Sequence, residues 1–547
     1  MVRLVSLEKL AGPADDPSAI PPSNGLQQWI DDPDGEKCVR GLLWKSAEYL
    51  RNGHEPEALN VLLQARSRLG YVPLSIMTNI LWLCRRLGRE QQAAGECLKF
   101  GQDAIGMGYH DLGLEACSAA LLLDAQGEFN IIRDPAALSG IAALYEQVAA
   151  TRAAGAALPA CPGARIHVAV LVPNLVDHVV AYTKTVLHLA RYMDREKFRL
   201  SVYVSENSSR RETSMFPFGC IDGTTPQTGA CTLKELESLR IPVVLVPRSM
   251  RFTAAAAHLA ETMNRNEVQI LLLASGLACP IDWLAARWAG VPVRFGIHLG
   301  TSFFMRGLDA TFIDNAENIR REEAYWGRDM GERIVWRAGT DTDELQRQPA
   351  LSRERFGIPR EAVVFGTLSN HLDRRLSIPY LETVGELLKT HAGAWFVAFG
   401  SGEIGDQKAF FESRGVASRV IFAGRQTQSG SALKLLDIYL NEFPVGGSQS
   451  VVEAMACGIP VVALRWSDAH AESAGASAVG ESCAVENRDV RAYAALAGRW
   501  ATDRAGRRTV GKELQSRAEK HYSVKNAIGA LMEKAEGCLQ LKCKTSP

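Results

Sequence analysis

Residues 437–464 constrain the fold of this chain more than any other segment. Their sequence is DIYLNEFPVGGSQSVVEAMACGIPVVAL: an apolar run, a turn with two glycines, a stretch of small residues that ends at Gly458, and a second apolar run from Ile459 to Leu464. This order predicts a buried strand, a tight turn, a short helix that begins near Ser450, and a second buried strand. Strands that alternate with helices in this way are typical of a parallel sheet covered by helices on both faces.

The turn before the short helix favours anion binding. Gly446, Gly447, Ser448 and Ser450 have small side chains, which leave backbone N–H groups uncovered at the predicted helix N-terminus. The helix dipole and these N–H groups both attract negative charge, and a diphosphate is their natural ligand. Glu453, one turn into the helix, can accept hydrogen bonds from a ribose. The alternative is structural, because Ser450 and Glu453 also have the spacing of a capping box that satisfies the helix's own amides.

Composition limits the class of protein. The 547 residues predict three or four domains, and 47% hydrophobic with 22% charged residues is typical of a soluble globular protein. Lys+Arg and Asp+Glu are equal at 61, which argues against nucleic acid and anionic membranes as partners. The sequence contains no transmembrane run and no signal peptide. Twelve cysteines occur singly, without metal-ligand spacing, so we expect reduced thiols, no zinc and a cytoplasmic location.

The first part of the chain is predicted to be helical. Residues 1–34 contain five prolines among polar residues and are predicted to be a disordered leader. From 35 to 155 the pattern is helical, and Gly53 and Gly88, 35 residues apart, each separate two helical stretches. This period is close to that of tetratricopeptide repeats, so we expect an all-α domain of about six helices. The Ala/Pro/Gly-rich residues 151–165 are the expected linker.

The rest of the chain is predicted to form two α/β lobes, at residues 163–340 and 341–547. Short apolar runs alternate with helical stretches in each lobe, while residues 341–356 between the two sets are polar. The pattern predicts two doubly wound sheets that face each other across a cleft, with ligands at the carboxyl ends of the strands. We expect the helical tail, 488–541, to close the second lobe. The predicted strands are 167–173, 198–204, 243–246, 270–274, 363–368, 395–399, 420–423, 437–440 and 459–464.

The run FPVGGSQSVVEAMACGIPVV resembles the nucleotide-sugar motif of GT-B glycosyltransferases. It is similar, position by position, to that of the family that contains O-GlcNAc transferase and bacterial cytoplasmic N-glycosyltransferases. The resemblance covers the architecture of about residues 36–530 and is motif-level only in the last lobe. It implies a GT-B pair of facing Rossmann-like domains, an acceptor lobe and then a nucleotide-sugar lobe, preceded by an all-α helical-repeat domain. Family members are inverting, use UDP-sugars without a metal, and glycosylate protein side chains.

The resemblance also implies roles for individual residues in the second lobe. Glu453 would hold the ribose; the family has an aspartate there, and glutamate keeps the acceptor function with a longer reach. Retaining GT-B enzymes have a second glutamate eight residues earlier, where this chain has Val445. The diphosphate would be held by Gly446, Gly447, Ser448, Gln449 and Ser450.

A cation for the leaving diphosphate is expected in the segment 369–384. The family has a lysine here, and Arg375, or Arg374 beside it, occupies the matching place. A fixed guanidinium can neutralise charge that builds on the leaving group, although the alternative is a pair of solvated surface arginines. A second turn, which follows the strand 420–423, is expected to line the uracil or to be an ordinary turn; it comprises Gly424, Arg425 and Gln426.

In the first lobe, Asp177 and His178 lie between a predicted strand and a predicted helix. The family has a histidine in this loop, so His178 is the candidate base for the acceptor, with a packed or capping histidine as the alternative. The loop GIHLGTSFF, 296–304, resembles the family's Gly-Thr-Ser turn over the donor and suggests Thr301 and Ser302, with His298 a weaker candidate.

Two further segments have weaker signals. Asp341 and Asp343 spell the DxD that other glycosyltransferases use to hold a metal, but they lie in the polar interlobe stretch rather than at a strand end. His470 and Glu472 follow the last predicted strand and could reach the sugar hydroxyls, or simply start a solvated helix.

We therefore expect a metal-independent, inverting glycosyltransferase that moves a hexose or N-acetylhexosamine from a UDP-sugar to a protein side chain. It needs no cofactor beyond the donor substrate. The repeats are expected to bind the protein acceptor or a second copy of the chain. A polysaccharide or lipid-linked glycan acceptor remains an alternative, although no membrane-facing element is evident. A nucleotide-sugar epimerase has no obvious use for the helical domain, and a non-catalytic scaffold is expected to have lost the phosphate loop, which is intact here.

Overall fold

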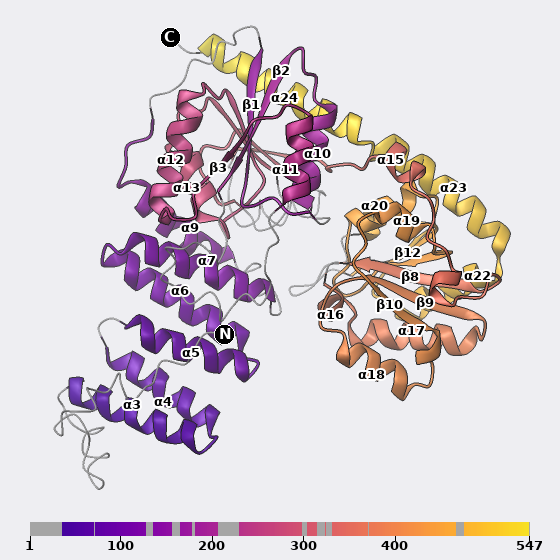
Figure 1. Cartoon of the computed structure of the whole chain (residues 1–547), viewed down its shortest axis with the longest axis horizontal. Helices are drawn as coiled ribbons and strands as arrows, with labels where there is room; N and C mark the ends of the chain where they lie inside the picture. Colours follow the sequence, from indigo (N-terminus) through magenta and orange to yellow (C-terminus); the bar gives the residue numbers. More distant parts are fainter. Residues whose placement is uncertain are drawn as a thin grey trace.

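The computed structural model contains a helical domain, a first α/β lobe and a second α/β lobe, in chain order (Figure 1). The predicted leader, 1–34, lies outside the residues that the structure describes. These are 35–69, 72–126, 135–155, 165–177, 181–205, 229–297, 303–313, 323, 331–369, 371–466 and 475–545.

The helical domain consists of paired antiparallel helices. Gly53 and Gly88, at φ +76° and +64°, lie in the turns between paired helices, where glycine adopts a left-handed backbone without strain. The predicted helix pairs are confirmed, whereas their assignment as tetratricopeptide repeats stays a prediction. Within the described residues, the helices are α3 (Gly35–Arg51), α4 (Glu55–Arg68), α5 (Leu74–Arg86), α6 (Glu90–Gly106), α7 (His110–Gln126) and α9 (Pro135–Ala149).

The helical domain and the first lobe share a hydrophobic core. Tyr145 of α9 packs edge-on against Trp283 of α13 (Pro280–Trp288), with 5.6 Å between ring centroids. The Tyr145 hydroxyl donates to the carbonyl of Leu277 at 2.9 Å, and Leu121 of α7 belongs to the same buried cluster. These contacts attach the helical domain rigidly to the first lobe, because the interface is apolar and buried.

The first lobe is a seven-stranded parallel sheet in the order β3-β2-β1-β4-β5-β6-β7. Alternate residues of β1 face opposite sides: Val168 and Val170 pack toward α10 (Ala181–Tyr192), while Ala169 and Leu171 pack toward α12 (Phe252–Arg265). Helices thus cover both faces. The strands are β1 (Ile166–Val172), β2 (Phe198–Val204), β3 (Val243–Leu245), β4 (Ile270–Leu273), β5 (Val293–Ile297), β6 (Ala310–Ile313) and β7 (Glu332–Val335).

The second lobe is a six-stranded parallel sheet in the order β10-β9-β8-β11-β12-β13. The chain moves outward from β8 to β10 and then returns to place β11 on the other side of β8. Two doubly wound sheets behind an all-α domain are the predicted fold class. The strands are β8 (Val363–Ser369), β9 (Ala394–Gly400), β10 (Val420–Gly424), β11 (Ile438–Leu440), β12 (Val461–Leu464) and β13 (Ala484–Val485).

The last helix differs from the prediction that the tail 488–541 closes the second lobe. Helices α22 (Val490–Thr502) and α23 (Arg504–His521) do pack on that lobe, but α24 (Val524–Thr545) crosses back to the first lobe (Figure 1). Its buried residues recur at helical spacing and join the core beneath β5 and α10, which is why it docks there. They are Val524, Ile528, Leu531, Met532, Ala535 and Leu539.

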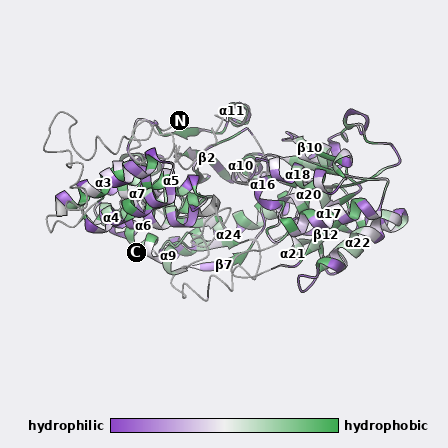
Figure 2. Cartoon of the chain, turned by 90° about the horizontal axis from the view of Figure 1, so that it is seen from below, coloured by the Kyte–Doolittle hydropathy of each residue, from purple (hydrophilic) through white to green (hydrophobic). Residues whose placement is uncertain are grey.

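The chain therefore passes between the two lobes twice, and the two crossing segments lie side by side. On the outward crossing, Thr340 donates its N–H to the carbonyl of Tyr522 at 2.8 Å; on the return crossing, Val524 donates to the carbonyl of Thr340 at 3.1 Å. Hydrophilic and hydrophobic residues are interspersed along the helices (Figure 2). Among the described helices, none is both long and apolar enough to cross a membrane.

Candidate functional site

Two loops meet where the strand order of the second lobe reverses. Strands β8 and β11 are parallel neighbours, so the segments after their carboxyl ends lie next to each other. One segment leads into α16 (Leu372–Arg375), and the other, through Gly446 and Gly447, leads into α20 (Gln449–Ala456). A reversal of strand order leaves a place for ligands at this edge of a doubly wound sheet. The fold thus brings together the two segments that the sequence singles out.

The N-terminus of α20 has no side-chain cap. Ser448 is the N-cap residue, and its side chain makes no capping hydrogen bond. The Ser450 hydroxyl instead accepts a hydrogen bond from Tyr439 at 2.9 Å, so the predicted capping box with Glu453 does not form. Because the first-turn amides lack this structural partner, the N-terminus keeps the features that attract an anion.

Arg375 lies directly against the glycine turn. A Cβ atom added at Gly447 would lie 3.1 Å from Nη1 of Arg375 and 2.8 Å from the hydroxyl oxygen of Ser450. A side chain at this position would push both groups aside, so glycine lets Arg375 and Ser450 approach the turn closely. The guanidinium and the uncapped helix N-terminus are therefore close enough to bind one diphosphate together.

Glu442, which the sequence did not single out, lies buried beneath the turn. Its carboxylate accepts hydrogen bonds from the hydroxyl of Thr367, from Nδ2 of Asn441 at 3.3 Å and from the backbone N–H of Gly447 at 3.3 Å. Burial raises the pKa of Glu442, although the nearby charge of Arg375 opposes the shift. Glu442 thus fixes the turn from inside. It was missed because the first residues after a strand show no periodicity that tells which way they point.

Glu453 is 1% exposed and forms an ion pair with Lys184 of α10, in the first lobe. Its Oε1 also accepts from Nε2 of Gln449 at 3.2 Å. Burial alone would raise the pKa of Glu453, but the charge and hydrogen bond of Lys184, together with hydrogen bonds from Ser429 and Gln449, outweigh burial and lower it. Lys184 was missed because a single lysine on an amphipathic helix has the pattern of a solvated charge. The side chain of Gln449 also donates to the carbonyl of Gly339 at 3.2 Å, which leaves only its backbone N–H for an anion.

Further arginines lie on the same edge of the sheet. The pKa of His371 lies below its ordinary value because it is partly desolvated and because Arg374, Arg375 and Arg425 oppose its protonation. Arg425 donates from Nε to the hydroxyl of Ser401 at 3.0 Å. The carboxyl edge of the second sheet therefore has a positive potential, which favours an anionic ligand.

The proposed uracil turn is only partly free to bind a base. Gly424 adopts φ +71°, and no atom lies within 4 Å of the place where its Cβ would be. The side chain of Gln426 donates to the carbonyl of Ala423 at 2.9 Å, so its amide NH₂ is engaged within the turn. The turn follows β10, two strands away from β8.

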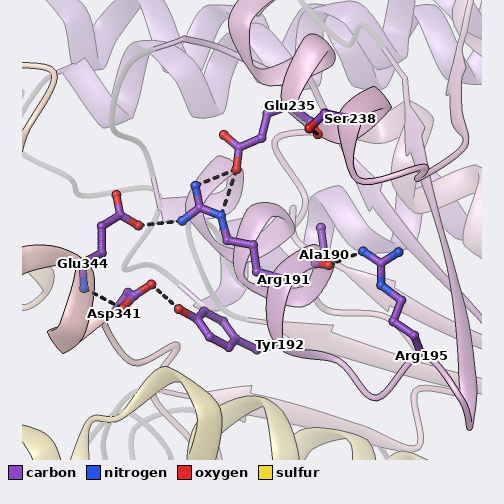
Figure 3. A network of polar contacts seen from close by, with 8 residues as sticks. All are labelled: Ala190, Arg191, Tyr192, Arg195, Glu235, Ser238, Asp341 and Glu344. Carbon is purple, nitrogen blue, oxygen red and sulfur yellow. Dashed lines mark hydrogen bonds and ion pairs between the residues drawn. The ribbon is translucent and has the colours of Figure 1, made fainter.

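The DxD segment has structural contacts. Asp341 accepts a hydrogen bond from the N–H of Glu344 at 2.9 Å, as N-cap of α15 (Thr342–Arg347), and another from the hydroxyl of Tyr192 (Figure 3). Asp343 pairs with Lys525 at 3.6 Å. The two carboxylates thus have separate partners. Neither lies directly at the carboxyl end of a strand, where this fold forms its ligand sites.

Several predicted residues lie outside the described part of the chain. In the first lobe, the preceding residue Asp177 is described, and its Oδ1 accepts from the N–H of Thr232 at 2.9 Å. The residues outside the description are His178, His298, Thr301, Ser302, His470 and Glu472.

Known proteins resemble this chain in two ways. Residues 362–503 match the family model "Glycosyl transferases group 1", which covers most of the second lobe. No curated protein matches the chain in sequence.

Solved structures resemble it in fold. A mutant O-GlcNAc transferase from Thermobaculum terrenum superposes with a TM-score of 0.58 at 16% identity, over 100% of this chain and 98% of that one. A glycosyltransferase from Rickettsia africae has a TM-score of 0.55 at 13% identity, over 69% and 99%. HepE from Anabaena, solved with UDP and glucose, has 0.52 at 14%, over 68% and 100%. This chain therefore has the GT-B fold, with an all-α domain in front, and contains a glycosyltransferase group 1 domain.

Proposed function

We propose that this chain is an inverting, metal-independent glycosyltransferase that moves a hexose or N-acetylhexosamine from a UDP-sugar to a protein side chain. The observation that carries the proposal is the contact between Arg375 and the Gly447 turn, at the uncapped N-terminus of α20. A guanidinium and a row of backbone N–H groups at one strand-order reversal form a site for a diphosphate.

The nucleoside is inferred from two features. Glu453 lies one turn into α20, where an ionised carboxylate accepts hydrogen bonds from ribose hydroxyls. HepE, which shares the fold of the two lobes, was solved with UDP and glucose. Uridine is therefore the nucleoside that we propose, with the turn at Gly424, Arg425 and Gln426 against the base.

The chemistry follows from the charge on the leaving group. The acceptor nucleophile forms a bond to the anomeric carbon as the bond from that carbon to the diphosphate oxygen breaks. The one additional negative charge of the departing UDP develops next to Arg375 and the helix N-terminus, which stabilise the transition state electrostatically. Arg374 and Arg425 add to the positive potential. We assign the acceptor's proton to His178, and the closing turn over the donor to Thr301 and Ser302.

A protein acceptor is favoured by the architecture. The likeness to the O-GlcNAc transferase extends over 100% of this chain, helical domain included, whereas the likeness to HepE covers 68%. Stacked helix pairs form extended surfaces that suit peptides. Metal independence is supported by the engagement of Asp341 and Asp343 with other residues. We place the reaction in the cytoplasm because the cysteines occur singly.

A thermal-shift and calorimetric screen tests the donor. We expect UDP and UDP-sugars to stabilise the wild type, GDP- and dTDP-sugars to stabilise it less, and Glu453→Ala to lose most of the UDP effect. Arg414→Ala serves as the matched control, because Arg414 lies on the same lobe in an exposed pair with Glu382. The absence of any nucleotide effect in the wild type would overturn the proposal in favour of a scaffold.

The acceptor is tested separately. Labelled UDP-sugar is incubated with the protein and cell lysate in the presence of EDTA, and the label is traced to protease-sensitive or protease-resistant material. We expect labelled protein. Label only in lipid or polysaccharide would retain the glycosyltransferase and refute its protein acceptor, and loss of transfer with EDTA would refute metal independence.

A further inference from the structure

Helix α10 of the first lobe makes several polar contacts with the second lobe. Lys184 pairs with Glu453 of α20. About two turns further along α10, Arg191 pairs with Glu344 of α15 at 2.6 Å, and the hydroxyl of the adjacent Tyr192 donates to Asp341 (Figure 3). Of these contacts, the one from Lys184 reaches the carboxylate that we assign to the ribose.

The Lys184–Glu453 pair is of a kind that matters energetically. The side chain of Glu453 is 1% exposed and that of Lys184 21%, whereas Arg191 and Glu344 are 31% and 43% exposed. An exposed pair contributes little because solvent screens it. A buried carboxylate that loses its cation is left without compensation, and it takes up a proton instead.

We propose that Lys184 is a positioning residue of the donor site, contributed by the first lobe. By holding Oε1 of Glu453, it keeps this carboxylate ionised and aimed, so that the ribose hydroxyls meet an acceptor that has no proton of its own. This role rests on the proposed function of Glu453. Lys184 is not a catalytic residue in this proposal, because it acts through Glu453 and not on the reacting atoms.

The pair also ties donor binding to the arrangement of the lobes. Lys184 and Glu453 lie 269 residues apart in the chain and on different lobes. The ribose acceptor is therefore ready only while α10 lies against α20. Loss of that contact weakens the donor site, even though the proposed diphosphate and uracil contacts belong to the second lobe.

The surroundings of Glu453 allow a pH test. The titratable groups that face it are Lys184 and His188 of α10 and the thiol of Cys457 at the end of its own helix; α19 (Ser429–Leu433) contributes the Ser429 hydroxyl. Burial and Lys184 lower the pKa of His188 to about 4, so it is neutral at neutral pH. Burial raises the pKa of Cys457 to about 12, so it is neutral as well. Between pH 5.5 and 8.5, Glu453 is thus the group whose protonation depends on Lys184.

The experiment measures the Kd of UDP by calorimetry across this pH range for wild type, Lys184→Met, Lys184→Arg and Arg191→Met. We expect Lys184→Met to bind about tenfold more weakly or worse at pH 7. Its affinity relative to the wild type should fall further as the pH falls, because the unpaired Glu453 then takes up a proton, whereas protonation of the terminal phosphate of UDP affects every variant alike. Lys184→Arg should restore most of the affinity and the wild-type pH profile. Arg191→Met, which also removes an interlobe ion pair but does not touch Glu453, should bind UDP as the wild type does.

A second pair of variants guards against misfolding of Lys184→Met. In the Glu453→Gln background, no carboxylate needs a cation, so adding Lys184→Met should change the Kd by less than about threefold. Equal weakening by Lys184→Met with and without Glu453→Gln would overturn the proposal, as would equal losses in Arg191→Met. If the wild type binds UDP and Lys184→Met binds it with the same Kd, this role of Lys184 is refuted while the proposed function stays intact. A wild type that binds no UDP at any pH would refute both.

Discussion

The two lobes have the same topology but opposite charge where their strand order reverses. In the first lobe the reversal lies between β1 and β4, and the groups at the adjoining strand ends are acidic: Asp177 receives the N–H of Thr232, and Asp282 is buried with the hydroxyl of Ser275. In the second lobe, the reversal between β8 and β11 has cations on its surface. These are Arg374, Arg375 and Arg425.

The difference shows that a doubly wound sheet provides the place for a ligand and the local residues provide its chemistry. An uncapped helix N-terminus beside guanidinium groups favours an anion in the second lobe, whereas the carboxylates of the first lobe oppose one. Buried carboxylates occur in both lobes, and Glu453 of the second lobe and Asp282 of the first have opposite pKa shifts. Glu453 has a cation beside it, whereas Asp282 has only hydroxyl partners.

The largest effect is expected from removing the cation of the second lobe. Arg375→Ala should lower kcat for sugar transfer by about 100- to 1000-fold, because charge on the leaving diphosphate is then no longer neutralised. The KM for the donor should rise much less, since the helix N-terminus still binds the ground state. Steady-state kinetics against Arg414→Ala measure both parameters. A fall of the same size in Arg414→Ala, or an unchanged kcat in Arg375→Ala, would show that the charge difference between the lobes is not used in catalysis.

The next prediction compares how the stability contributions of two buried carboxylates, Asp282 and Glu453, depend on pH. Burial raises the pKa of Asp282 from 3.8 to about 6, so the wild type loses stability from this group as the pH rises from about 4 to 6. Asp282→Asn removes that loss, and its thermal midpoint should gain a few degrees on the wild type across this range. The pKa of Glu453 is lowered, so its contribution is present above 4.5 and is lost only as the pH falls below that value.

Glu453→Gln should therefore differ from the wild type by a constant amount between pH 5 and 7. Melting curves of both variants at each pH check this. If the stability difference from the wild type varied with pH in the same way for both variants, Lys184 would not be what gives Glu453 a different pKa shift from Asp282.

A smaller effect is expected at the glycine turn. Gly447→Ala places a methyl group 3.1 Å from Nη1 of Arg375, so the guanidinium must move by a few tenths of an ångström. We expect UDP affinity to fall several-fold, about 1 kcal/mol, with little change in stability. Gly393→Ala is the control, because no atom lies within 4 Å of its added Cβ. If Gly447→Ala bound UDP as strongly as the wild type does, Arg375 would not be part of the diphosphate site.

The smallest effect is expected in the DxD segment, where two variants test whether Asp341 and Asp343 have structural roles or bind a metal. Asp341→Ala should cost about 1 kcal/mol of stability, because α15 loses its N-cap. Asp343→Ala should be near neutral, since its pair with Lys525 is exposed on both sides. Neither variant should acquire a dependence on divalent cations. Equal loss of transfer in both, rescued by Mg²⁺ or Mn²⁺, would contradict the structural assignment.

Most strands with continuous apolar runs were predictable from the sequence, although the short β6 (Ala310–Ile313) was missed. The predicted run 198–204 has the bounds of β2, and the predicted 363–368 falls within β8. Strands interrupted by charge were missed: β5 contains Arg294, whose guanidinium turns back to the carbonyl of Ala289 at 2.6 Å. The polar β7 was missed for the same reason. The partner of α24 was wrong because an apolar helix face shows that a helix is buried, without showing against which sheet.

The site was predictable where it follows from chain order. Parallel strands end at one edge, so the proximity of Arg375 to Gly447 follows from the two strands that precede them. The sequence could not reveal Lys184, because its contact with Glu453 depends on how two separate lobes pack. Nor could it reveal that Glu442 points inward. Both are single charged residues whose direction is set by tertiary structure.

The return of α24 to the first lobe has a consequence for how the protein is made. The sheet that begins with β1 lacks one wall of its core until α24, Val524–Thr545, has left the ribosome. The second lobe is synthesised in between, so it can complete its own core first. Nascent chains that stop short of Val524 should therefore expose apolar surface on the earlier lobe and become substrates for chaperones or proteases, although Arg374 and Arg375 have already been synthesised.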